Sequence, residues 1–138
     1  MAEGVTFTRA FAALQKAIGI AQKRHELISG NISNVDTPDY RAKDIDFKTA
    51  MAHALESEDS LRLARTSEAH MGPNGDGVNG VNGPGPVQET GEWNGYNWVQ
   101  IDREMVRLME NNMRYRTATE LLLRKIAILK EVIREGGR

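Results

Sequence analysis

The chain has 138 residues, a net charge of −1 and 40% hydrophobic residues. This length favours a single domain, and the balance of residues is typical of a folded protein rather than a disordered one. The absence of cysteine excludes disulfides, thiolate metal sites and cysteine nucleophiles. Because non-specific nucleic-acid binders carry a basic excess, the near-neutral charge argues against a nucleic-acid partner.

No membrane span or leader peptide is expected. No apolar run reaches the ~18 residues that a membrane-spanning helix needs. The first ten residues include Glu3 and Arg9, and they lack the basic, apolar and small-residue regions of a secretory signal. We therefore expect a protein without a cleavable signal peptide, which stays in the cytoplasm or leaves it by a route that cleaves no leader.

Segment 5–35 predicts a long helix with a heptad seam. Its apolar positions alternate in steps of four and three residues, which is the pattern of a coiled coil. The seam consists of Phe7, Phe11, Leu14, Ile18, Ala21, His25, Ile28 and Ile32. Only His25 departs from its apolar character. Ile20 and Leu27, seven residues apart, widen the apolar face.

A helix end, a turn and an extension are predicted for segments 31–35 and 36–50. The turn residues are Asn31, Asn34, Asp36, Thr37, Pro38 and Tyr40. The two asparagines can bond to the freed carbonyls of a helix end or adopt unusual backbone angles. Pro38 prevents the helix from continuing, and the Tyr40 ring can fold back onto the seam.

Segment 51–97 predicts an acidic connection rich in Gly, Pro and Asn. Eight of the 13 glycines lie in 72–95, a composition that supports only short strands, near 61–65 and 87–90. Gly75, Gly77 and Gly80 have the spacing of a nucleotide-binding loop, but no strand precedes them and prolines follow. They predict a turn-rich linker.

We expect no enzyme, no cofactor and no metal site. Asp44 and Asp46 flank Ile45, but no other feature of the sequence suggests a catalytic cleft around them. The three histidines lie far apart, without the spacing of metal ligands. The serines lack the setting of a nucleophile elbow.

Segment 98–135 predicts a second helix with a heptad seam. The seam consists of Trp98, Ile101, Met105, Leu108, Asn112, Tyr115, Thr119, Leu122, Ile126, Leu129 and Ile133. It is apolar at both ends and polar in its centre, and a polar centre can specify register or partner number at a cost in stability. Gly136 and Gly137 follow the last seam residue and favour a helix stop.

The fold class is therefore mainly α: two heptad helices paired as a coiled-coil hairpin within a single domain, 1–138, joined by a long Gly/Pro-rich loop with at most short strands. A single hairpin leaves other apolar residues without cover. They include Val106, Met109, Met113, Leu121, Leu123 and Ile128. We interpret this surplus as an interface.

The turn resembles the N-terminal signature of bacterial flagellar axial proteins, the family of rod, hook and hook-associated proteins. The matching residues are Asn31, Ile32, Asn34, Val35, Asp36, Thr37, Pro38, Tyr40, Arg41 and Ala42. Ser33 stands where alanine is common, and Asp39 replaces the usual glycine. Within the superfamily, segments 43–47, 63–66, 70–71 and 97–115 are similar to proximal rod proteins of the FlgB type.

This resemblance implies a structural subunit of the proximal rod, which stacks helically into a hollow shaft that transmits torque across the periplasm. It implies export through the flagellar type III apparatus. The implied partners are copies of the chain, other rod proteins, the inner-membrane ring and components of the rod base and export gate.

Two other classes remain open. A cytosolic helical regulator or secretion chaperone would use the same seams to bind a partner helix. A small DNA-binding protein would use the basic C-terminal segment, 93–138, where nine bases face six acids, and its binding would depend on salt.

Overall fold

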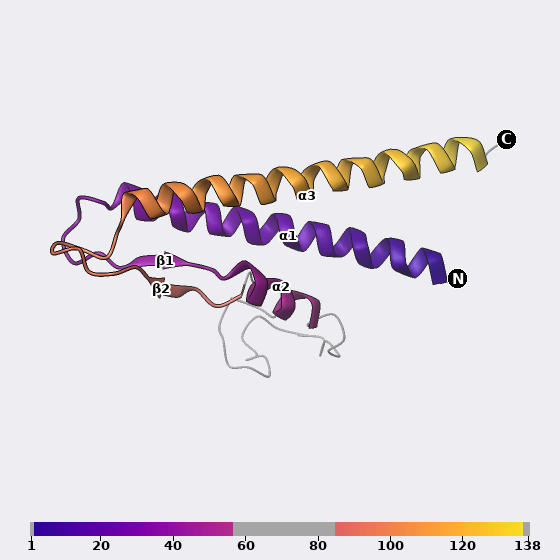
Figure 1. Ribbon diagram of the computed structural model, residues 1–138. Helices are drawn as coiled ribbons and strands as arrows, with labels where there is room; N and C mark the ends of the chain where they lie inside the picture. The colour runs from indigo at the N-terminus through magenta and orange to yellow at the C-terminus, as the bar shows by residue number, and fades with distance from the viewer. Residues whose placement is uncertain (1, 57–84, 137–138) are drawn as a thin grey trace, which may run out of the picture.

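The computed structural model describes residues 2–56 and 85–136. Its elements are α1 (Ala2–Ser33), β1 (Ala42–Asp44), α2 (Phe47–Glu56), β2 (Gln88–Thr90) and α3 (Ile101–Gly136). The long helices α1 and α3 run antiparallel as a hairpin, and the small elements lie along one side of it (Figure 1). The mainly helical fold predicted from the sequence is confirmed.

The helix bounds follow from local hydrogen bonds. The side-chain amide of Asn34 donates to the Gly30 carbonyl at 2.8 Å and caps the end of α1. Before α3, the backbone N–H of Trp98 donates to the Tyr40 carbonyl at 3.0 Å. This bond holds 98–100 outside the helix, so α3 begins at Ile101 rather than at 98 and runs through Gly136.

Helix α2 lies where the sequence analysis expected an extension and a connection. Asp46 caps it, because the Asp46 carboxylate accepts the N–H of Thr49 at 3.0 Å. At the other end, Lys16 of α1 donates to the Ala54 carbonyl at 2.6 Å. The spacing of apolar residues after Asp46 carries the signal for this helix, although the helix has only 10 residues.

The two short strands form one antiparallel ladder, with Ala42 opposite Thr90 and Asp44 opposite Gln88. Strand β2 confirms the strand expected near 87–90, whereas β1 was not anticipated. The predicted strand at 61–65 and the glycine motif at 75–80 lie outside the described residues. After β2, Gly91 adopts φ 105°, and a Cβ there would come within 2.1 Å of the Trp98 carbonyl oxygen, so this position requires glycine.

A small apolar core lies between α1, α2 and the segment that follows β1. It consists of Ile20, Ile45, Ala50 and Ala54, with Leu27, Phe47 and Met51 packed against it. The pair Ile20 and Leu27 therefore belongs to the contact with α2. In the described part of the chain, none of the helices combines the length and apolar character of a membrane span.

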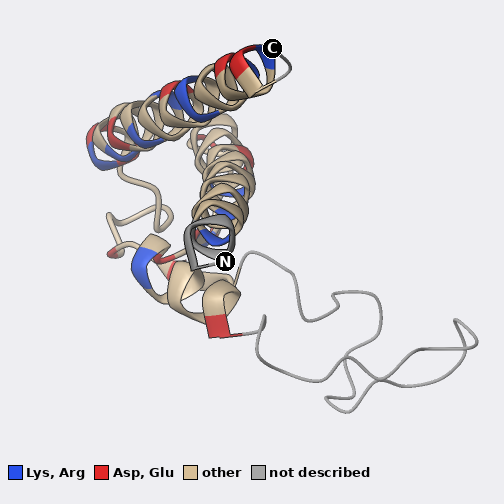
Figure 2. Ribbon diagram, turned by 90° about the vertical axis from the view of Figure 1, so that its right-hand side faces the viewer, with Lys and Arg blue, Asp and Glu red and all other residues tan. Residues whose placement is uncertain are grey.

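The two long helices diverge toward the chain ends. Near the turn, Asn31 of α1 contacts Glu104 of α3, and midway Asn111 contacts the Ala21 carbonyl. Further along, the contact is a long side chain, with the Lys125 ammonium 4.7 Å from the centre of the Phe7 ring. Figures 1 and 2 both show the N- and C-terminal ends of the hairpin lying apart.

We predict that α2 loses stability in acid. Hydrogen bonds from the side chain and the backbone of Thr49 lower the pKa of Asp46 below its ordinary value of 3.8. The ionised Asp46 carboxylate therefore stabilises α2 fully when the pH is above 3.8. This contribution is lost as the pH falls through the lower pKa that Asp46 has in the folded protein. Amide-exchange protection of Ala50 between about pH 5 and pH 2 measures it. Asp46→Asn retains a cap without the charge, and an equal acid response in that variant would contradict the prediction.

Candidate functional site

A buried ion pair joins α1 to β1. The Arg24 guanidinium donates from Nε and Nη2 to the two Asp44 carboxylate oxygens, at 2.8 and 2.9 Å. Their side chains are only 9% and 10% exposed. The hydrogen bond to Asp44 raises the pKa of Arg24. This bidentate geometry compensates for the loss of hydration of both charges and fixes the orientation of β1 on α1.

Asn31 connects three elements. It is fully buried, and its amide donates to the Lys43 carbonyl and to Glu104 Oε2, each at 2.8 Å. Its Oδ1 accepts the Lys43 N–H at 2.9 Å. A single side chain of α1 therefore satisfies both backbone groups of the central β1 residue and one carboxylate oxygen of α3.

Arg107 completes the cluster. Its Nη1 donates to Glu104 Oε1 at 2.7 Å, and its Nε lies 3.8 Å from Asp44 Oδ2. We call the five residues Arg24, Asn31, Asp44, Glu104 and Arg107 the polar clamp. It holds α1, β1 and α3 together at the turn end of the hairpin.

Asn97 holds the turn against the segment that precedes α3. It is fully buried, and its amide donates to the carbonyls of Val35 at 2.6 Å and Thr37 at 3.2 Å. The Tyr96 hydroxyl donates to the Asp36 carbonyl at 2.8 Å. The turn is therefore held through its backbone carbonyls.

The side chains of the predicted turn lie in different environments. Asn31 is buried in the polar clamp, and Asn34 caps α1. Asp36, Thr37 and Pro38 are exposed, whereas Tyr40 is half-buried. The structure therefore assigns packing roles to the asparagines and leaves the tip of the turn open.

The sequence analysis missed Arg24, Asp44, Glu104 and Arg107 as a cluster, and it missed Asn97. Arg24 lies four residues after Ile20 and four before Ile28 on a buried face of α1, and a charge in that position is the signal for a buried partner. Nothing in the local pattern of 97–107 indicates that Glu104 joins Asp44 as a second acidic residue of the cluster. Its contact with Asn31 joins residues that are 73 positions apart in the sequence.

The predicted seam of α1 faces the interior in part. Ala21 and Ile28 are buried, and five others, Phe7, Phe11, Leu14, Ile18 and Ile32, are half-buried, whereas His25 is exposed. Half-burial along most of the seam means that α3 covers it incompletely.

The predicted seam of α3 does not lie against α1 as expected. Most of its residues are exposed or nearly so: Ile101 (47%), Met105 (47%), Tyr115 (37%), Ile126 (43%), Leu129 (44%) and Ile133 (67%). Asn112 is also exposed, whereas Leu108 and Leu122 are half-buried. The buried residues of α3 are Glu104, Asn111 and Ala118.

The polar clamp explains this correction. Glu104 must face Asn31, and it precedes the seam residue Met105 by one position. One position corresponds to a rotation of about 100° around a helix. The contact of α3 with α1 is therefore centred beside the apolar seam of α3. Many seam side chains remain accessible, although a symmetric coiled coil would bury them.

Other exposed apolar residues on α3 lie on its remaining faces. They are Val106 (65%), Met109 (68%), Met113 (70%), Leu121 (46%), Leu123 (60%), Ile128 (60%) and Val132 (62%). A helix that is apolar on most of its circumference requires cover from other chains.

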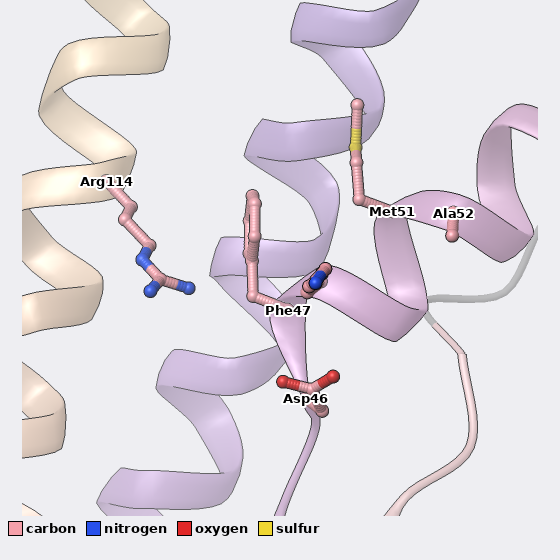
Figure 3. A pocket seen from close by; sticks show the side chains of 6 residues that line it. Asp46, Phe47, Met51, Ala52 and Arg114 are labelled. Carbon is pink, nitrogen blue, oxygen red and sulfur yellow. The ribbon is translucent and has the colours of Figure 1, made fainter.

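A shallow hollow between α2 and α3 carries no catalytic arrangement. Phe47 and Met51 form its apolar wall, and the Arg114 guanidinium lies 4.9 Å from the centre of the Phe47 ring (Figure 3). Arg114 also pairs with Glu110 at 2.6 Å. Within residues 2–56 and 85–136, no group of three or more His, Asp or Glu side chains is placed to hold a metal ion.

The chain is similar to curated flagellar basal body rod proteins named FlgB. It is 32% identical to the protein of Aeromonas hydrophila over 131 residues, which covers 94% of this chain and 96% of the relative. It is 29% identical to the Salmonella typhimurium protein over 127 residues, covering 89% and 91%. It is 29% identical to the Bacillus subtilis protein over 134 residues, covering 94% and 97%. No protein-family profile matches the chain.

We predict that Asp44→Ala lowers the free energy of unfolding by about 3–5 kcal/mol, because it leaves the Arg24 charge buried without a partner. Glu89→Ala is the matched control. It breaks the Arg41–Glu89 pair, whose side chains are 59% and 58% exposed, and should cost at most about 1 kcal/mol. Urea unfolding followed by circular dichroism compares the two variants, and equal losses would contradict a structural role for the clamp.

We predict that the Asp39 position distinguishes residues by backbone conformation. Asp39 has φ 56°, and its N–H donates to the Tyr96 carbonyl at 3.1 Å. Aspartate tolerates this left-handed conformation, whereas a β-branched residue does not. Asp39→Val should lower the unfolding free energy by about 1–2 kcal/mol, while Asp39→Gly folds normally. Thermal melts of both variants measure this, and similar melting temperatures would refute the assignment.

Proposed function

The chain belongs to the FlgB family of flagellar basal body rod proteins, and we propose that it is a subunit of the proximal rod. In this proposal, copies of the chain assemble helically with other rod proteins into a hollow shaft that transmits torque across the periplasm. The observation that carries the proposal is the apolar surface of α3, which the rest of the chain leaves uncovered.

Burial energetics support a subunit that is completed by its neighbours. Met109, Met113, Leu123 and Ile128 are each at least 60% exposed on α3. Fully burying such a side chain contributes roughly 1.5–3 kcal/mol. These residues point to several sides of the helix, so one partner could not cover them all, whereas neighbours in a helical assembly could.

The polar clamp supports a defined subunit shape in that assembly. It holds the hairpin at the turn end through hydrogen bonds and ion pairs between mostly buried side chains. At the opposite end, α3 reaches α1 through a long side chain, that of Lys125, which contacts the Phe7 ring. In this proposal, the turn end keeps its shape and the open end becomes ordered when neighbouring subunits cover it.

The further partners and the route follow from the family. We assign the inner-membrane ring and components of the rod base and export gate as neighbours, and the flagellar type III apparatus as the export route. A small core of four buried residues and three flanking ones supports passage as an unfolded chain. The relatives described above are rod proteins, which favours the rod over a cytosolic regulator, a secretion chaperone or a DNA-binding protein.

Mass spectrometry of purified, detergent-extracted basal bodies from the source bacterium tests this function. We expect the chain in the rod fraction, with several copies per particle, and a non-motile deletion strain that a plasmid copy rescues. A chain that is absent from basal bodies and folded in the cytosol with a client protein would overturn the proposal.

A further inference from the structure

The two predicted seams meet on one side of the hairpin rather than at its centre. A groove between α1 and α3 is lined by Ala21, Gln22, His25, Glu26, Asn111, Asn112 and Tyr115. Four of these, Ala21, His25, Asn112 and Tyr115, are seam positions. A third helix in this groove would therefore contact residues of both seams at once.

The groove has a polar centre and an acidic side chain at its edge. Asn111 is 1% exposed, and its amide donates to the Ala21 carbonyl at 2.8 Å. Its Oδ1 is buried and has no hydrogen-bond partner among the described residues. At the groove edge, the Glu26 carboxylate pairs with Lys23 at 2.9 Å, and the Glu26 side chain is 65% exposed. A matching helix could bring a further basic side chain to this exposed carboxylate.

Apolar residues occupy the same heptad position as Asn112 on either side of it. Met105, seven residues before Asn112, is 47% exposed, and Ile126, fourteen residues after it, is 43% exposed. Heptad spacing places both on the side of α3 that carries Asn112. An occupant should therefore combine apolar residues at helical spacing with a basic side chain between them.

The distal half of α3 has this character. Leu121, Ile128 and Val132 are 46%, 60% and 62% exposed, and their spacing of seven and four places them on one side of the helix. Arg124 lies between Leu121 and Ile128. Residues 121–136 hold four bases and two acids, a net charge of +2. The rest of the described chain leaves this side of α3 exposed.

We propose that the groove of one copy receives the distal half of α3 from a second copy. Leu121, Ile128 and Val132 then cover the half-exposed seam residues, and Arg124 faces the exposed carboxylate of Glu26. This contact rests on the proposed function, because it assigns one of the contacts between subunits of the rod.

The proposed contact is heterologous, because the groove and the distal stripe are different surfaces of the chain. Each copy offers both, so the contact repeats without closing and generates a filament. Asn112 and Ile128 are 16 positions apart on α3, which corresponds to about 24 Å along a helix at 1.5 Å per residue. Successive copies are offset along the hairpin by about this distance.

Cysteine cross-linking in assembled basal bodies tests the contact. The chain contains no cysteine, so two co-expressed variants, Asn112→Cys and Ile128→Cys, carry the only reactive thiols of the subunit. A bis-maleimide should yield a product of twice the 15.4 kDa chain mass when both variants are present, and none from either variant alone. Ala52→Cys replaces Asn112→Cys in the control. Ala52 is exposed on α2, which carries neither the groove nor the distal stripe, so this variant should give no product with Ile128→Cys.

Each other outcome overturns the proposal in a distinct way. A product from Asn112→Cys alone would mean a symmetric contact, and a product with a different rod protein would mean that another subunit occupies the groove. Incorporation of both variants without any product would refute the contact and leave the rod function intact. Absence of the wild-type chain from basal bodies would instead refute the rod function, and the contact with it.

A charge substitution provides a second measurement. Asn112→Glu places a carboxylate in the groove next to Glu26, so we expect about tenfold less incorporation into basal bodies. Ala52→Glu, which adds the same charge on α2, outside both the groove and the distal stripe, should incorporate normally. Circular dichroism should show equal helix content in both, because both positions are exposed. Equal incorporation of the two variants would contradict the proposal.

Discussion

The buried contact between Arg24 and Asp44 is the constraint on which the rest of the structure depends. A bidentate pair that is about nine-tenths buried tolerates little displacement, and it fixes β1 on α1. With β1 in place, Lys43 presents its backbone to Asn31. Asn31 then determines which side of α3 faces α1, because its amide requires the Glu104 carboxylate. One ionic contact therefore sets the geometry of the whole hairpin.

This geometry separates the chain into two regions with different physical character. At the turn end, polar side chains are mostly buried and form a connected network of hydrogen bonds and ion pairs. At the open end, α3 carries aliphatic side chains that are 43–67% exposed, from Ile126 to Ile133. Buried polar contacts are specific, because each group needs a matching partner within the chain. An exposed apolar surface can pack against different partners and therefore suits contacts between subunits.

The turn illustrates how a family signature is maintained by tertiary contacts. The carbonyls of Val35, Asp36 and Thr37 accept hydrogen bonds from Tyr96 and Asn97, which are some 60 positions away. The left-handed conformation of Asp39 preserves a backbone that glycine adopts more readily. Aspartate can stand there because the turn depends on backbone carbonyls rather than on the side chain at 39.

The sequence by itself determined the two long helices, the turn between them, the glycine-rich connection and the family. These features follow from local periodicity, from Pro38 and from a contiguous motif. The sequence did not determine the polar clamp, the helix α2 or the face of α3 that meets α1. Seam periodicity identifies an apolar face but not its partner, and the register was decided by contacts between residues far apart, such as Asn31 and Glu104. Only the tertiary structure could therefore show that α3 leaves much of its seam exposed and that residues of both seams line a shared groove.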